Sequence, residues 1–255
     1  MEVAGSVALV AGGGGLLGSV TAARLLAHGA EVMICDLTEG RSRALLTEHG
    51  GRARFMRFDV TDDAAVAAAC AEANRDGRFR ILIATVGTGF AKRTLAADGT
   101  LHDVASFQQM LDQHVLGSFV LIRRAAEAMA GNQILHGERG VIVLTSSLAG
   151  LEGSAGQIAY GSAKAAVAGM VLPAARDLAP LGIRVMAIAP GAMAEPDAGD
   201  PSDERVAALI NNVVHPRRLG TPDEYALLAT QIVEHPYLNG SVIRLDGGAR
   251  LGLKY

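Results

Sequence analysis

Short apolar runs alternate with longer amphipathic stretches along most of the chain. The runs are rich in β-branched and aliphatic residues and predict buried strands, whereas the Ala- and Leu-rich stretches with helical spacing predict helices. Strands are expected at 6–11, 31–36, 52–58, 80–85, 139–146, 182–189 and 241–245. Helices are expected at 16–28, 39–49, 62–76, 106–130, 154–180, 203–213 and 221–234.

This order of elements predicts an α/β fold. Strands that are apolar throughout and are each followed by a helix indicate a parallel sheet covered by helices on both faces. Right-handed crossovers then give a doubly wound, Rossmann-type domain with about seven strands. We expect a single domain over 1–255, in which the segment of about 191–215 is a flexible lid over the substrate crevice.

Composition narrows the class of protein. Half of the 255 residues are hydrophobic and the net charge is −3, which suits a compact protein and provides no basic patch for nucleic acid. The two cysteines, Cys35 and Cys70, are too few for a disulfide framework or a metal site and indicate a reducing, cytoplasmic location. The most apolar helix carries Lys164, Arg176 and Asp177, so no membrane span is expected. No nucleic-acid or membrane partner is expected, and the expectation of a small-molecule substrate comes from the candidate catalytic residues instead.

A glycine-rich loop follows the first predicted strand and leads into a helix. Gly12, Gly15 and Gly18 recur at three-residue intervals, which predicts a loop whose backbone amides face a pyrophosphate. The alternative is a flexible turn, which would not need this spacing. Asp36 ends the second strand, where a carboxylate binds ribose hydroxyls and repels a 2′-phosphate, so NAD is favoured over NADP.

Further charges follow at the same edge of the predicted sheet. Arg41 and Arg43 come soon after the second strand and could weaken the preference for NAD, although this is also an ordinary solvated place for arginine. Asp59 follows the third strand and would suit the adenine amino group. Asp59 or Asp62 has an equally good structural explanation as a helix N-cap residue.

The candidate catalytic residues lie in the second half of the chain. Tyr160 and Lys164 are four residues apart, so they share one face of the predicted helix. A cation beside a phenol lowers its pKa, and the phenol can then exchange a proton with an alcohol or a carbonyl. Ser147, which follows a predicted strand, would bind the same substrate oxygen. A Tyr–Lys pair alone is more often a surface pair, so the other motifs carry the prediction.

Together with Pro190-Gly191, these motifs stand in the order of a known superfamily. The chain resembles the short-chain dehydrogenase/reductase superfamily over essentially its full length. The segments 169–186, 218–225 and 239–247 are similar to those of the type II 3-hydroxyacyl-CoA dehydrogenases. The resemblance implies NAD(H), a homotetramer, and reversible oxidation of a 3-hydroxyacyl thioester or another secondary alcohol.

The resemblance also implies roles for individual residues. Tyr160 would be the base, Ser147 would position the hydroxyl, and Lys164 would bind the nicotinamide ribose and lower the pKa of the tyrosine. Gln157 would face the substrate. The implied cofactor contacts are Gly12, Gly15, Leu17, Gly18, Asp36, Asp59, Val60, Thr85, Gly87, Tyr160, Lys164, Pro190, Gly191, Met193 and Glu195.

Several positions depart from the family pattern around the cofactor. Ala11 replaces the usual Thr, and Leu16 stands where these enzymes have Gly. The family's Asn after the fourth strand is absent, whether the motif begins at Ala84 or at Thr85. The Thr that holds the nicotinamide carboxamide becomes Glu195.

His114 is a further departure, because it replaces the Asn that supports a water relay to the lysine. Its ring would either bridge that water or displace it, and we count His114 among the candidate catalytic residues.

Three functions remain as hypotheses. The first is an NAD-dependent oxidoreductase, because Ser147, Tyr160 and Lys164 are all present. The second is a cofactor-independent isomerase, cyclase or dehydratase that uses the same three residues as acid and base groups, and the altered cofactor positions motivate it. The third is a non-catalytic scaffold, against which the intact catalytic residues argue.

Overall fold

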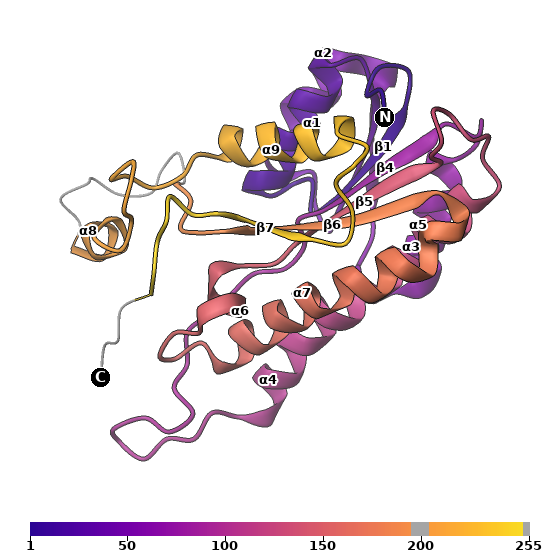
Figure 1. Ribbon diagram of the computed structural model, residues 1–255. Helices are drawn as coiled ribbons and strands as arrows, with labels where there is room; N and C mark the ends of the chain where they lie inside the picture. The colour runs from indigo at the N-terminus through magenta and orange to yellow at the C-terminus, as the bar shows by residue number, and fades with distance from the viewer. Residues whose placement is uncertain (195–203, 252–255) are drawn as a thin grey trace.

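The computed structural model describes residues 1–194 and 204–251. Its strands form one parallel sheet of seven strands in the order β3-β2-β1-β4-β5-β6-β7 (Figure 1). The order reverses between β1 and β4, which makes this point the switch where doubly wound folds bind ligands. The predicted fold class is confirmed. The strands are β1 Val7–Ala11, β2 Glu31–Asp36, β3 Ala53–Arg57, β4 Phe79–Ala84, β5 Gly140–Thr145, β6 Ile183–Pro190 and β7 Val242–Leu245.

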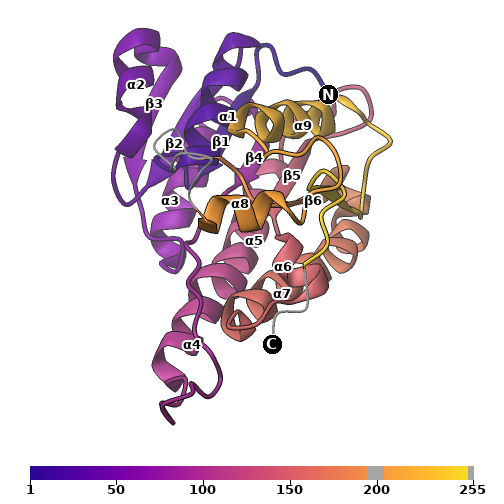
Figure 2. The ribbon, with the colours of Figure 1, turned by 90° about the vertical axis from the view of Figure 1, so that its left-hand side faces the viewer.

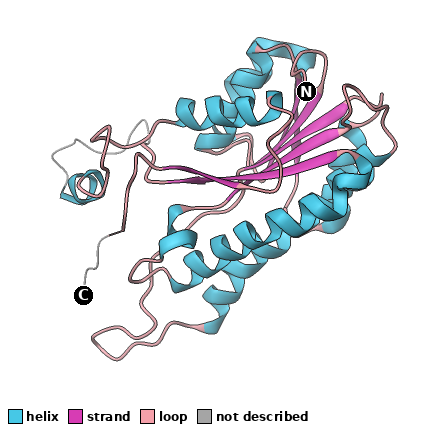
Figure 3. Cartoon of the chain, in the orientation of Figure 1, coloured by secondary structure: helices cyan, strands magenta, loops and turns pink. Residues whose placement is uncertain are grey.

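Helices cover both faces of the sheet (Figure 1, Figure 3). On one face, Val10 and Ile34 pack against α1 and α9, and on the other, Leu9 and Leu82 pack against α3, α5 and α7. Neighbouring strand residues thus serve opposite cores, which explains why the strands are apolar throughout. The helices are α1 Leu16–Ala27, α2 Arg43–His49, α3 Asp63–Ala73, α4 Val104–Met110, α5 Gly117–Ala130, α6 Leu148–Glu152, α7 Ile158–Leu178, α8 Glu204–Ile210 and α9 Pro222–Glu234.

Three predicted helices differ from the structure, and the one expected at 39–49 becomes α-helical only at Arg43, after a 3₁₀ turn at Gly40–Ser42. The helix expected at 154–180 begins only at Ile158, because Gly153 and Gly156 both have positive φ angles that break a helix. A separate short helix, α6, precedes this break. The helix expected at 106–130 is α4 and α5 joined by a π-helical turn, Leu111–Leu116. Such turns insert an extra residue and often mark functional sites.

The long helix α7 packs along the sheet and contacts β5 and β6. Within the described ranges, the stretch Ile158–Leu181 is long and apolar enough to cross a membrane, judged by length and composition alone. Its inner face belongs to the core, where Val167 and Val171 are buried. An 18-residue window of this stretch is 33% buried, so core packing accounts for part of its apolar character.

The edge where the strands end carries the segment expected as a lid. Figure 2 looks onto this edge, with α8 in front of the sheet. Residues 195–203, and with them Glu195, lie outside the described residues. The proposed lid over 191–215 therefore stays a prediction.

Candidate active site

The glycine loop lies flush against the sheet. A Cβ on Gly12 would come within 2.8 Å of the Thr85 backbone, and one on Gly13 within 2.8 Å of the Ile34 side chain. A Cβ on Gly18 would collide with the Gly12 carbonyl. Side chains at these positions would push the loop away from the sheet, so packing itself requires the glycines.

The amino end of α1 faces outward from this loop. Gly15 is its N-cap and supplies no side-chain hydrogen bond, so the first amides of the helix receive no cap from that residue. Amides of this kind, together with the helix dipole, bind phosphate groups. The loop and helix thus fit the pyrophosphate of a dinucleotide, as the glycine spacing predicted.

A cavity of about 440 Å³ lies beyond the ends of β1, β2 and β4. Predicted cofactor residues from four separate segments line it, as do Thr88 and Gln113, which were not predicted. The predicted residues that line it are Gly12, Gly15, Asp36, Asp59, Val60, Thr85 and Gly87. The predicted contacts Leu17, Gly18, Tyr160, Lys164, Pro190, Gly191 and Met193 lie outside its lining.

The carboxylate of Asp36 is fixed by the glycine loop. Its Oδ2 accepts a hydrogen bond from the Gly14 amide at 2.9 Å, and its Oδ1 accepts one from the Leu37 amide at 2.7 Å. Neither Arg41 nor Arg43 lines the cavity. The acidic group at this position therefore faces the cavity without a neighbouring arginine in the lining.

Asp59 and Asp62 have different roles in the structure: Asp62 caps a helix, and Asp59 lines the cavity. Asp62 is the N-cap of α3 and accepts hydrogen bonds from the Ala64 and Ala65 amides. Asp59 lines the cavity, but its Oδ1 also accepts from the amide and the hydroxyl of Thr61. Asp59 therefore stabilises the turn in which it lies through Oδ1. No hydrogen bond to its Oδ2 is seen among the described residues, so this oxygen is left for a ligand in the cavity.

Ser147, Tyr160 and Lys164 come together next to this cavity. Ser147 follows β5 as the N-cap of α6 and hydrogen-bonds the Tyr160 hydroxyl. The Lys164 ammonium nitrogen lies 5.7 Å from the centroid of the Tyr160 ring and donates a hydrogen bond to the Thr145 carbonyl at 2.8 Å. The prediction that Tyr160 and Lys164 share one helix face is confirmed.

Burial dominates the protonation of this pair. It lowers the pKa of Lys164, which is only 4% exposed, to about 7. Burial also raises the pKa of Tyr160, and the hydrogen bond with Ser147 opposes that rise. The expected lowering of the Tyr160 pKa by Lys164 is therefore wrong for these side chains alone, because desolvation disfavours both charged forms.

His114 lies in the π-helical turn and packs against the same tyrosine. Its ring is 1% exposed and meets the Tyr160 ring edge to face, with centroids 5.5 Å apart. Its Nε2 lies 3.1 Å from the Thr88 carbonyl oxygen, so Nε2 carries the proton and donates it, and Nδ1 has no partner among the described residues. The ring fills the space beside Gly87, where a Cβ would collide with it.

Burial and then the charge of Lys164 lower the pKa of His114 to about 4, and the hydrogen bond to Thr88 opposes them. The imidazole is therefore neutral near pH 7. Its predicted part in a proton relay stays a prediction.

Gln157 lies apart from the cofactor cavity. It precedes α7 and lines an open groove with Thr94 and Gly156. The loop after β4 closes against this groove, since the Lys92 amide donates to the Gly156 carbonyl at 2.6 Å. Its predicted contact with substrate stays a prediction.

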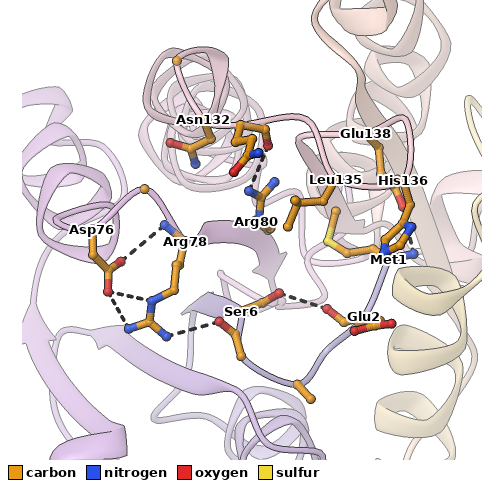
Figure 4. A pocket seen from close by; sticks show the side chains of 15 residues that line it. Met1, Glu2, Ser6, Asp76, Arg78, Arg80, Asn132, Leu135, His136 and Glu138 are labelled. Carbon is orange, nitrogen blue, oxygen red and sulfur yellow. Dashed lines mark hydrogen bonds and ion pairs between the residues drawn. The ribbon is translucent and has the colours of Figure 1, made fainter.

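Another cavity, of about 430 Å³, lies at the opposite edge of the sheet (Figure 4). Arg80 is buried there and donates to the carbonyls of Arg139 and Gln133, while Arg78 pairs with Asp76. These interactions join strand starts to neighbouring loops, far from Tyr160. Within the described ranges, no group of three or more His, Cys, Asp or Glu side chains forms a candidate metal site.

The fold, the glycine loop and the Ser–Tyr–Lys cluster define a class of dinucleotide-dependent oxidoreductases. The model of the short chain dehydrogenase family matches residues 6–206. The chain belongs to this family and is an oxidoreductase. The family match favours that hypothesis over an isomerase, cyclase, dehydratase or scaffold.

Individual relatives match over nearly the whole chain. Human 3-hydroxyacyl-CoA dehydrogenase type-2 is 41% identical over 253 residues, covering 98% of this chain and 97% of the relative. The Drosophila melanogaster protein of the same name is 39% identical over 249 residues, covering 96% and 98%. The crystal structure of 3-hydroxyacyl-CoA dehydrogenase type-2 from Mycobacterium avium superposes with a TM-score of 0.91 at 40% identity and full coverage of both chains. The predicted resemblance is confirmed.

Proposed function

We propose that this protein is an NAD-dependent oxidoreductase that interconverts a secondary alcohol and a ketone, with a 3-hydroxyacyl-CoA as the alcohol. The observation that carries the proposal is the cluster of Ser147, Tyr160 and Lys164 beside a cavity shaped for a dinucleotide. The substrate class rests on the names of the relatives, which match over at least 96% of the chain.

The preference for NAD rests on Asp36. A carboxylate fixed at the cavity wall attracts ribose hydroxyls and repels a 2′-phosphate. Arg43, which would favour the phosphate, instead lies 3.7 Å from the Glu39 carboxylate and outside the lining. Both observations support NAD as the cofactor.

The reaction divides among three side chains. When bound, the dinucleotide accepts or supplies the hydride. The Tyr160 phenolate would take the proton of the substrate alcohol during oxidation, and the neutral phenol would return it during reduction, while Ser147 hydrogen-bonds the same oxygen. Lys164 would bind the ribose hydroxyls, and its ammonium, when protonated, would offset part of the burial that keeps the pKa of Tyr160 high. Because its pKa is about 7, Lys164 is close to half protonated at neutral pH.

A paired substitution tests the proposal. Tyr160→Phe is expected to bind NADH normally, as followed by nicotinamide fluorescence, and to reduce acetoacetyl-CoA roughly 100-fold or more slowly, because the proton donor is lost. Tyr237, which is 92% exposed, provides the matched control, and Tyr237→Phe should leave turnover unchanged. Absence of saturable NADH binding by the unaltered protein at millimolar cofactor would refute the proposal.

We further propose that the protein is a homotetramer in the cytoplasm. The helices α5 and α7 expose large apolar side chains, among them Phe119 at 52% and Leu172 at 45%. Burying such surface against another subunit is favourable. The two free cysteines are both buried, which suits a reducing compartment. Sedimentation that finds only a 26.3 kDa species at micromolar concentration would contradict the assembly.

A further inference from the structure

The last described residues of the chain, 246–251, pack against α6, and we call them the C-terminal strap (Figure 2). The Leu251 amide donates a hydrogen bond at 3.0 Å to Oε2 of Glu152, the last residue of α6. Leu148, the first residue of α6, shares a small buried apolar cluster with Ala249. The strap therefore packs against α6 through a hydrogen bond at one end of the helix and an apolar cluster at the other.

Arg244, in β7, joins α6 to the sheet and to the strap. Its Nη1 lies 2.8 Å from Glu152 Oε1, and its Nη2 lies 2.6 Å from Asp246 Oδ2 and donates to the Ala249 carbonyl at 3.0 Å. The Glu152 and Asp246 side chains are only 18% and 6% exposed, so solvent screens these pairs less than pairs on the surface. Arg250 also approaches Glu152, at 3.2 Å, but its side chain is 64% exposed. Arg244 therefore provides the more buried of the two links to Glu152.

The place of α6 depends on such contacts. A helix of five residues is too short to be stable alone, so its neighbours determine where it lies. A Cβ on Gly150 would come within 2.6 Å of the Ala165 amide nitrogen, which means that α6 lies flush against α7 on that side. Glu152 is two residues further along, on nearly the opposite side of the helix, and there Arg244 holds it.

Ser147 moves with α6 because it is the N-cap of this helix. Its hydroxyl accepts a hydrogen bond from the Ala149 amide at 3.2 Å, and its carbonyl accepts one from the Gly150 amide at 3.0 Å. The same hydroxyl hydrogen-bonds Tyr160. A shift of α6 would therefore displace the serine hydroxyl from the tyrosine, and a displacement of about 1 Å at a reacting group can cost roughly 100-fold in rate.

We propose that Arg244 is a positioning residue of this active site. By holding Glu152 it keeps α6, and with it the Ser147 hydroxyl, in the place that the reaction requires. Arg244 acts through Ser147 and transfers no proton itself. This inference rests on the proposed function, in which Ser147 hydrogen-bonds the substrate oxygen.

A double-mutant cycle on turnover tests the inference. Arg244→Met should lower kcat for the reduction of acetoacetyl-CoA by roughly tenfold and change the Kd of NADH, followed by nicotinamide fluorescence, by less than about twofold. In a Ser147→Ala background, the same substitution should lower kcat by less than about twofold, because the hydroxyl that Arg244 positions is gone. Loss of folded protein alone would lower kcat by the same factor in both backgrounds.

Arg78 provides the matched control. It also contacts two carboxylates, those of Glu31 and Asp76, but at the opposite edge of the sheet. Arg78→Met should therefore leave kcat unchanged.

Two further variants probe the same ion pair. Arg244→Lys keeps the positive charge but loses the fork that reaches both carboxylates, so it should recover part of the lost turnover. Glu152→Gln weakens the pair from the side of α6 and should lower kcat with the same dependence on Ser147. This variant also serves if Arg244→Met fails to fold.

The outcomes separate the two proposals. If the unaltered protein reduces acetoacetyl-CoA but Arg244→Met leaves kcat unchanged, or lowers it equally with and without the serine hydroxyl, the inference about Arg244 is overturned and the proposed function stands. If the unaltered protein neither binds NADH nor reduces acetoacetyl-CoA, the proposed function fails and the inference fails with it.

Discussion

Replacing His114 by Asn should change how stability depends on pH. The pKa of His114 falls from 6.5 to about 4 on folding, first because of burial and then because of the Lys164 charge. Between these values the unfolded chain binds a proton that the folded chain does not, so stability is lost as pH falls through this window. The full shift corresponds to roughly 3 kcal/mol, at 1.36 kcal/mol per pKa unit.

Urea unfolding followed by circular dichroism at pH 7.5, 6 and 4.5 measures this effect. The free energy of unfolding of the unaltered protein minus that of His114→Asn should decrease by about 2.5 kcal/mol between pH 7.5 and 4.5. Titrating groups that do not interact with His114 cancel in this difference. His235 is exposed, so His235→Asn removes no buried imidazole and should give a flat difference. A difference for His114→Asn that is constant to within about 0.5 kcal/mol would refute the buried, neutral histidine.

Three further predictions follow from the site. Lys164→Met should remove the unfavourable burial of an ammonium. The free energy of unfolding of the unaltered protein, measured with urea, should therefore rise by about 2 kcal/mol relative to that of the variant between pH 7 and pH 9. A difference that does not change with pH would contradict this. Asp36→Ala should narrow the preference for NAD over NADP by about tenfold in calorimetric titrations, since repulsion of the 2′-phosphate is lost, and an unchanged ratio would remove Asp36 from cofactor selection. Gly18→Ala should lower the free energy of unfolding by about 2 kcal/mol or more, because its Cβ collides with the Gly12 carbonyl, and the exposed Gly169→Ala is the helix control.

Much of the fold could be predicted because buried parallel strands leave a strong pattern. Each strand of the sheet falls within two residues of its predicted bounds, since residues such as Leu9 and Val10 face opposite cores and must both be apolar. The helix breaks at Gly153 and Gly156 were missed, because a glycine in a sequence does not reveal the sign of its φ angle.

Site residues could be predicted where they lie at the carboxyl end of a strand. Asp36 is the last residue of a strand and Ser147 comes soon after one, and parallel strands bring their carboxyl ends to one edge. Gln113 was missed because its approach to the cavity depends on the π-helical turn, whose hydrogen-bond pattern leaves no mark on side-chain periodicity. The direction of the Tyr160 pKa was missed because burial depends on every neighbour at once.

The π-helical turn places two successive residues, Gln113 and His114, in different parts of the site. Gln113 borders the nucleotide cavity, and His114 supports the Tyr160 ring. The same backbone hydrogen bonds therefore position both a residue that borders the cavity and the ring that packs against Tyr160. A mutation that straightens this turn is therefore expected to displace both residues at once, so that cofactor affinity and turnover change together.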